Sequence, residues 1–471
     1  MDMKRPNILF ILCDDLGWTD LACYGSSFYE TPNLDKLAAR GMRFTDAYAS
    51  CPVCSPTRAS AMTGKYPASV GVTQFGGAHN VGRLCDVPYF DQIPLSDYTL
   101  AEALRERGDY QTWHVGKWHL GGPAHWPEKR GFDRNIGGCQ DGMPHHGYFS
   151  PWKIPALEEG EAGEYLTDHL TDKSLKLIEN RDPDRPFFLN YWPYAVHTPI
   201  QAPEALVEKY RKKADDLGLD QRDPIEEGPE MQVLHKLGKH IRRRTFQSDP
   251  VYAAMVENLD ANIGRLLDKL EAEGERDNTL VVFTSDNGGL ATSEGSPTCN
   301  APLAEGKGWM YEGGTRECLI ASWPGKIPEG VESGVVTTTP DFYPTFLEAA
   351  GLDPIPEQHR DGVSLMSALK GDTTFDRGAV FWHYPHYANQ GGTPGCSVRE
   401  GDWKLIRFYE DDRLEFYNLR EDISEARDLS ETEPETVRRL HEKLENWLVE
   451  VNALIPRANP LWERQKLARR H

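Results

Sequence analysis

Acidic and amide side chains directly follow two short apolar runs of the sequence. Asp14 and Asp15 come after the first run, and Asp286 and Asn287 come after a later one. Three carboxylates and one amide oxygen form a hard, all-oxygen set of ligands, which suits Ca²⁺, or Mg²⁺ as second choice, better than zinc. Because acidic residues after a strand also serve as helix caps or turn formers, the metal interpretation depends on which other residues meet them.

Two cysteines, Cys51 and Cys54, are separated by two residues. A C-x-x-C pair alone would fit a redox site or half of a zinc site, but no second such pair follows. The same segment also satisfies the pattern C-x-P-x-R through Cys54, Pro56 and Arg58. Because proline is favoured in the first turn of a helix and helix formers follow Pro56, we expect a helix to begin at Cys54. The positive end of that helix would favour a bound anion.

Two lysines and two histidines complete the set of candidate residues. Lys117 and His119 alternate in a stretch that we expect to be extended, so both would point into one pocket. His197 follows a further apolar run, and Lys307 stands between two glycines. Fixed positive charges beside a metal ion would neutralise the oxygens of an anionic substrate.

Together these segments resemble the type I sulfatases of the alkaline phosphatase superfamily, and the resemblance runs from Asn7 to about Leu419. It implies a sulfuric ester hydrolase in which a formylglycine-generating enzyme oxidises the cysteine of the C-x-P-x-R pattern. It implies a divalent-metal site, Ca²⁺ or Mg²⁺, at Asp14, Asp15, Cys54, Asp286 and Asn287. It implies catalytic roles for Cys54, Arg58, Lys117, His119, His197 and Lys307.

The resemblance also implies how these residues share the work. One hydroxyl of the hydrated formylglycine, assisted by Asp286, would attack sulfur while Arg58 holds the hydrate. His197, with Lys307 nearby, would protonate the leaving oxygen, because an alkyl oxygen leaves badly without a proton. His119 would then take the proton of the second hydroxyl, so that sulfate is expelled and the aldehyde reforms.

The substrate is less defined by the sequence. We expect a sulfated carbohydrate, because aromatic residues could stack on sugar faces, although core packing suits each one equally: Trp126, Tyr148, Trp152, Trp382 and Tyr384. The loop 138–148 lacks the serine that some family members place near the sulfate. His145 and His146 in that loop, and His383 and Arg399 further along, are candidate substrate contacts.

Two other functions remain open at this point. A phosphonate or phosphate ester hydrolase of the same superfamily would use similar residues. A non-catalytic binder of sulfated glycans would keep the fold without the catalytic residues. The complete set of candidate residues argues against this alternative.

Alternating strand and helix patterns predict the elements that position these side chains. Apolar runs at 7–12, 186–192 and 279–284 read as buried parallel strands, and an apolar stripe over 255–270 reads as a helix. The pattern predicts an α/β fold with a large, mostly parallel or mixed sheet between helices. After residue 372, short strands and one helix indicate a smaller antiparallel subdomain, which divides the chain into 1–372 and 373–471.

Composition narrows the choice of partners. The 471 residues carry a formal net charge of −21, which disfavours nucleic acid and anionic membranes. No apolar run near the start approaches the ~20 residues of a membrane helix. We see no secretory signal, so the chain as it stands would be cytoplasmic, or periplasmic or secreted if a leader was trimmed. The charged stretch 211–248, with its basic cluster Lys239 to Arg244, is expected to form a solvated insertion or lid.

Overall fold

The apolar runs that precede the acidic pairs form the centre of a nine-stranded sheet. In this computed structural model, which describes residues 4–470, β1 (Asn7–Cys13) lies between β5 (Phe187–Trp192) and β8 (Thr279–Ser285). It pairs in parallel with both neighbours. Every residue of the three strands is buried, as expected for parallel strands covered on both faces.

The sheet is mixed, in agreement with the expected fold class. The strand order is β10-β2-β9-β8-β1-β5-β3-β4, with β11 paired to β2. Strand β9 runs antiparallel to β8 and to β2, whereas the other pairings are parallel. The remaining strands of this sheet are β2 (Met42–Tyr48), β3 (Gln111–Gly116), β4 (Arg134–Ile136), β9 (Arg316–Ser322), β10 (Val331–Ser333) and β11 (Thr337–Thr338).

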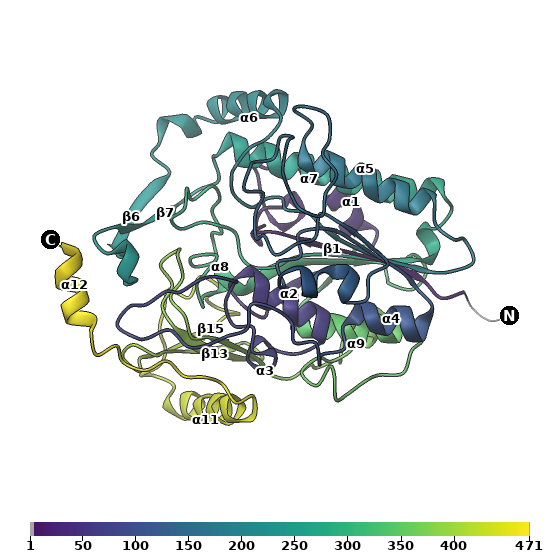
Figure 1. Cartoon of the computed structure of the whole chain (residues 1–471). Helices are drawn as coiled ribbons and strands as arrows, with labels where there is room; N and C mark the ends of the chain where they lie inside the picture. The colour runs from purple at the N-terminus through teal and green to yellow at the C-terminus, as the bar shows by residue number, and fades with distance from the viewer. Residues whose placement is uncertain (1–3, 471) are drawn as a thin grey trace.

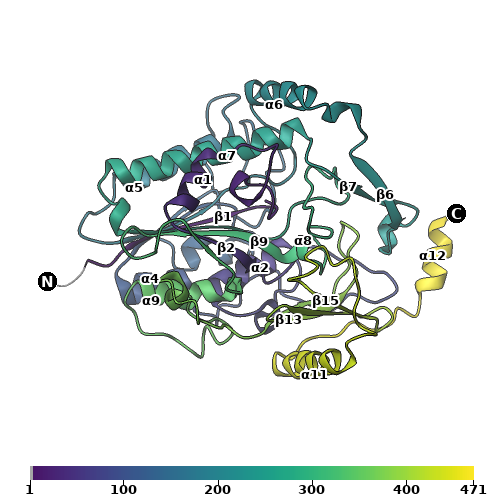
Figure 2. The same ribbon diagram turned by 180° about the vertical axis from the view of Figure 1, so that it is seen from behind.

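Helices cover both faces of the large sheet (Figures 1 and 2). One face carries α1 (Pro32–Ala39), α5 (Leu166–Glu179) and α7 (Pro250–Ala272), with α6 (Glu204–Asp216) packed outside on α7. The other face carries α2 (Cys54–Thr63), α4 (Leu100–Gly108) and α9 (Phe342–Ala349). The apolar stripe of α7 is buried, because it faces the sheet and its neighbouring helices.

A second, four-stranded antiparallel sheet lies beside the first, with strand order β12-β13-β14-β15. Helix α11 (Pro434–Glu450) packs its apolar face on this sheet, and α12 (Trp462–Arg470) lies at the opposite end of the molecule from the N-terminus (Figure 1). The expected boundary after residue 372 stays a prediction. The strands are β12 (Val380–Tyr384), β13 (Gly395–Glu400), β14 (Trp403–Phe408) and β15 (Leu414–Asn418).

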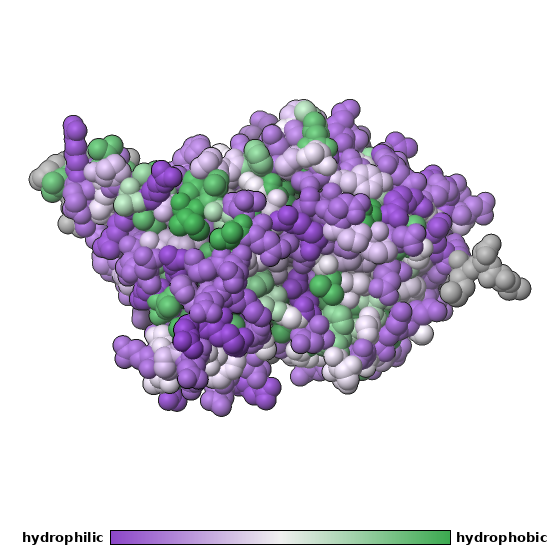
Figure 3. Space-filling view, turned by 90° about the horizontal axis from the view of Figure 1, so that it is seen from below, coloured by the Kyte–Doolittle hydropathy of each residue, from purple (hydrophilic) through white to green (hydrophobic). Residues whose placement is uncertain are grey.

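The charged stretch 211–248 contains the end of α6 and a two-stranded hairpin of β6 (Ile225–Glu230) and β7 (His240–Arg244). Three further short helices, α3 (Pro67–Val70), α8 (Glu312–Thr315) and α10 (Met366–Leu369), lie in connecting segments. The face seen in Figure 3 is largely hydrophilic, with hydrophobic residues in small separate groups. No helix within residues 4–470 is long and apolar enough to cross a membrane.

Candidate active site

The two acidic pairs meet at one edge of the large sheet, because β1 and β8 are parallel neighbours and end together. The backbone N–H of Asp286 donates to Cys13 O at 3.1 Å, and that of Asp15 donates to Asp286 Oδ1 at 3.3 Å. Asn287 Nδ2 donates to Asp15 Oδ1 at 2.8 Å. Asp14, Asp15, Asp286 and Asn287 are all buried, so this cluster is removed from bulk water.

The donor set at this edge fits a hard divalent cation. Ligand atoms of Asp14, Asp15 and His197 lie within 4.8 Å of one another. Asn287 Oδ1 is buried and has no hydrogen-bond partner among residues 4–470, which is unfavourable unless a cation takes that place. Burial, together with the charge of Asp286, raises the pKa of Asp14 to about 8, against the lowering effect of Lys117. Oxygen ligands of this kind suit Ca²⁺ or Mg²⁺.

Cys54 is the first residue of α2, as the proline pattern predicts. Its Sγ lies 3.4 Å from Nδ1 of His119. Burial raises the pKa of the Cys54 thiol, although Lys117 and Lys307 act in the opposite direction. The unmodified thiol is therefore protonated near neutral pH and is a weak nucleophile. Cys51 is also buried, and neither cysteine forms a disulfide.

Arg58 lies on the second turn of α2 and is fully buried. Its Nε donates to Asp286 Oδ2 at 2.8 Å, and one of its terminal nitrogens donates to Lys117 O at 3.1 Å. The guanidinium also lies over the ring of Trp192, with 5.2 Å to the ring centroid. These contacts make Arg58 the group that fixes Asp286 in place.

Lys117 and His119 both belong to the cluster around Cys54, but the backbone between them is not extended as expected. Lys117 follows the end of β3, and its Nζ donates to the two carboxylate oxygens of Asp14 at 2.9 and 2.7 Å. His119 has φ of 59°, so the expectation of extended backbone is wrong there. Burial, then Lys117 and Arg58, lowers the pKa of His119 well below its ordinary value. The imidazole is consequently neutral in the folded chain.

Lys307 and His197 form a second pair beside Asp15. Lys307 Nζ donates to Asp15 Oδ2 at 2.9 Å and lies 3.1 Å from His197 Nε2. The other ring nitrogen of His197, Nδ1, lies 2.9 Å from Thr198 O. Burial and Lys307 lower the pKa of His197 to about 3, although Asp15 raises it. The sequence assigns His197 to acid catalysis only, whereas the structure also places its Nε2 3.6 Å from Asp15 Oδ2, within the group of candidate cation ligands.

The four candidate substrate contacts divide into two groups. His145 and His146 are exposed on their loop, and His145 Nε2 lies 3.9 Å from Asp141 Oδ1. His383 is only 4% exposed and bonds to Tyr409 and to Leu454 O through its two ring nitrogens.

Arg399 is also 4% exposed, and its side chain contacts Asp46, Tyr48 and Gly401 O. His383 and Arg399 therefore join the second sheet to its surroundings, and they do not line the cluster around Cys54.

Most of the aromatic residues expected to stack on sugars are core residues. Tyr148, Trp152, Trp382 and Tyr384 are at most 1% exposed, because they fill the contacts between loops, helices and sheets. Tyr148 has a position that sequence reasoning missed. Its hydroxyl oxygen lies 2.6 Å from Tyr194 O and 2.8 Å from His197 O, so its single proton is shared between these carbonyls and holds the backbone that presents His197. No local signal in the sequence could have indicated this contact.

Comparisons with known proteins show the family to which the chain belongs. The Sulfatase family profile matches residues 6–352, and the profile named N-sulphoglucosamine sulphohydrolase, C-terminal, matches residues 305–453. A protein named Sulfatase from Formosa agariphila is 31% identical over 96% of this chain and 90% of its own length. N-acetylgalactosamine-6-sulfatase from Canis lupus familiaris is 34% identical over 81% of this chain and 69% of its own length.

A solved structure has a similar fold over almost the whole chain. The crystal structure of Ps i-CgsB in complex with k-i-k-neocarrahexaose matches with a TM-score of 0.76 and 27% identity. The match covers 99% of this chain and 98% of that one. The chain therefore belongs to the sulfatase family of the alkaline phosphatase superfamily and is a sulfatase.

Proposed function

We propose that this sulfatase removes sulfate from a sulfated saccharide. It would use a formylglycine made from Cys54, together with a bound divalent cation, for which Ca²⁺ is the first choice and Mg²⁺ the second. One observation carries the proposal: Cys54, the first residue of α2, lies beside His119 at a buried cluster of carboxylates that also contacts Lys117, Lys307 and His197. Two similar proteins also support a saccharide as the substrate. One is named for N-acetylgalactosamine, and the other was crystallised with neocarrahexaose.

Asp14, Asp15, Asp286 and Asn287 would hold the cation, beside residue 54. The cation would withdraw charge from sulfate oxygens, and formylglycine would supply a hydroxyl nucleophile. Lys117, which already neutralises Asp14, would add a fixed positive charge near the sulfate. Arg58 keeps Asp286 oriented, because it donates to one of its carboxylate oxygens at 2.8 Å.

The two histidines would carry protons in different steps of the reaction. His119 is neutral and 3.4 Å from the Cys54 sulfur, so it is suited to accept a proton from a group on that residue. Lys307 donates a proton to Nε2 of His197 at 3.1 Å, and His197 is partly exposed. That pair is suited to deliver a proton to the oxygen of a leaving saccharide.

The modification is tested by peptide mass and by substitution of the two neighbouring cysteines. Co-expression with a formylglycine-generating enzyme should convert Cys54 to the aldehyde and raise activity. Cys54→Ala should abolish turnover, whereas Cys51→Ala, which removes an equally buried thiol, should retain most of it. An active Cys54→Ala protein would contradict the proposal.

The substrate class is tested by desulfation across a panel of sulfated saccharides, with matched sulfate and phosphate esters assayed in parallel. We expect sulfate release from at least one saccharide and slower hydrolysis of the matched phosphate ester. Faster phosphate hydrolysis would favour the alternative phosphonate or phosphate ester hydrolase. Binding without turnover by the aldehyde form would favour a non-catalytic glycan binder.

A further inference from the structure

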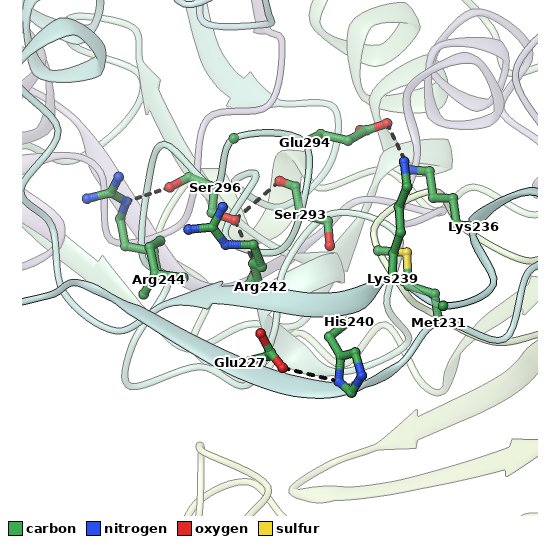
Figure 4. Close-up of a pocket in the computed structure, with 13 residues that line it drawn as sticks. Glu227, Met231, Lys236, Lys239, His240, Arg242, Arg244, Ser293, Glu294 and Ser296 are labelled. Carbon is green, nitrogen blue, oxygen red and sulfur yellow. Dashed lines mark hydrogen bonds and ion pairs between the residues drawn. The ribbon is translucent and has the colours of Figure 1, made fainter.

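A cavity of about 740 Å³ lies between the β6–β7 hairpin and the loop 293–296, outside the cluster around Cys54. Figure 4 shows the side chains that line it. The hairpin and its turn contribute most of the positive charge, from Lys236, Lys239, His240, Arg242 and Arg244. Two carboxylates, Glu227 and Glu294, face the same cavity. Four lysine and arginine side chains therefore oppose two glutamates, in a chain whose formal net charge is −21.

The positive charges share one side of the hairpin for a simple reason. His240, Arg242 and Arg244 alternate along β7, and alternate residues of a strand point to the same face. Arg243, in contrast, points away and pairs with Glu305. The cavity is thus the basic face of β7 closed by a loop.

Two of the cations remain available to a ligand. Lys236 lies 3.6 Å from Glu294, and Arg244 lies 3.6 Å from Asp249. Neither Lys239 nor Arg242 makes an ion pair within the described residues 4–470, and both are exposed. A lysine and an arginine without a carboxylate partner form a site for an oxyanion, because arginine presents paired donors to such a group.

The loop that closes the cavity belongs to the same segment that supplies residues of the candidate active site. The backbone N–H of Ser293 donates to Arg242 O at 2.7 Å, and Arg243 pairs with Thr292 in an isolated bridge. The same loop begins with the cation ligand Asn287 and continues to Lys307. Ser293 is six positions after Asn287, so these two positions are at most ~22 Å apart. One oligosaccharide can span that distance.

We propose that this cavity binds a second sulfate group on the same saccharide chain whose scissile sulfate lies at Cys54. The inference rests on the proposed function, and it narrows the substrate to a multiply sulfated oligosaccharide or polysaccharide. A chain of net charge −21 repels polyanions at long range, so a local excess of cations is needed to hold one near the active site.

The test compares two double variants that remove the same charge from the stretch 211–248. Lys239→Ala/Arg242→Ala removes the two unpaired cations of the cavity. Lys212→Ala/Arg222→Ala removes two exposed cations elsewhere in that stretch and serves as the control. The probes are a κ-carrageenan hexasaccharide, its desulfated counterpart and 4-nitrophenyl sulfate. Binding is measured by calorimetry at low and at high salt, and turnover is measured separately.

We expect the cavity variant to weaken binding of the sulfated hexasaccharide at least about tenfold at low salt, and less at high salt. The control variant should stay within about twofold, and kcat/KM for 4-nitrophenyl sulfate should not change in either. Equal affinity of the two variants, or the same loss with the desulfated probe, would overturn the proposal. A wild-type protein that desulfates no saccharide would contradict the proposed function. Because binding needs no turnover, the calorimetric comparison of the two variants would still show whether the cavity binds a sulfate group.

Discussion

Lys307 Nζ lies 3.1 Å from Nε2 of His197, and both side chains contact Asp15. An ammonium group has no acceptor, so Lys307 donates and Nε2 accepts. Nδ1 then carries the ring hydrogen and donates to Thr198 O at 2.9 Å. The proton that would reach a leaving group therefore starts on Lys307, and His197 would pass it on through Nε2.

This pair should matter most for a poor leaving group. His197→Ala is expected to lower kcat for a sugar sulfate by about 10²–10⁴-fold and to affect 4-nitrophenyl sulfate much less, because a nitrophenolate leaves without a proton. The measurement is the ratio of the two kcat losses in one protein preparation. Equal losses on both substrates would remove His197 from the acid role.

Asn287 should be needed for cation binding and not for folding. Asn287→Ala deletes the orphaned amide oxygen, so we expect weaker Ca²⁺ affinity and a smaller rise of Tm on adding Ca²⁺. Asn278→Ala, just before the opposite end of β8, is the matched control. The Tm of each variant is measured with chelator and across a Ca²⁺ titration. An unchanged Ca²⁺ response in Asn287→Ala would exclude this residue as a ligand.

Tyr148 should act by positioning His197. Tyr148→Phe keeps the buried ring but leaves the carbonyls of Tyr194 and His197 without its hydroxyl, at a cost of about 1–3 kcal/mol in the free energy of unfolding. We expect kcat on a sugar sulfate to fall while KM changes little. Tyr165→Phe loses a comparable bond, to Gln201 O, without touching His197. A similar drop of kcat in both variants would indicate a general effect of destabilisation.

Buried histidines should make the fold sensitive to acid. Burial, with His386 nearby, lowers the pKa of His383 to about 3 in the folded chain, whereas an unfolded histidine titrates near ~6.5. Between these values the unfolded chain binds more protons, so the free energy of unfolding falls as pH falls. The slope for one such histidine is about 1.4 kcal/mol per pH unit.

Urea unfolding at pH 7 and pH 5 measures this slope. His383→Gln should make the loss between the two pH values smaller, because one buried neutral imidazole is gone. His79→Gln, whose side chain is 82% exposed, should leave the slope unchanged. Identical slopes in wild type and His383→Gln would contradict the assignment.

Local patterns in the sequence were sufficient for the strands that end at the acidic pairs and for the helix that begins at Cys54. A continuous apolar run of six or seven residues indicates a strand that is buried on both faces. A proline that is favoured in the first turn indicates where a helix begins. Both signals can be read from residues that are neighbours along the chain. The α/β fold, the antiparallel sheet after residue 372 and the grouping of Asp14, Asp15, Asp286 and Asn287 therefore followed from the amino-acid order.

Contacts between distant segments decided the rest. The pairing of Arg58 with Asp286, the left-handed backbone at His119 and the hydroxyl of Tyr148 behind His197 each depend on residues far away in the chain. His383 and Arg399 have the residue types of a sulfate site, yet the packing of the second sheet buries them. Residue type and spacing determine which chemistry is possible, whereas burial and partners, which exist only after the chain has packed, determine where it takes place.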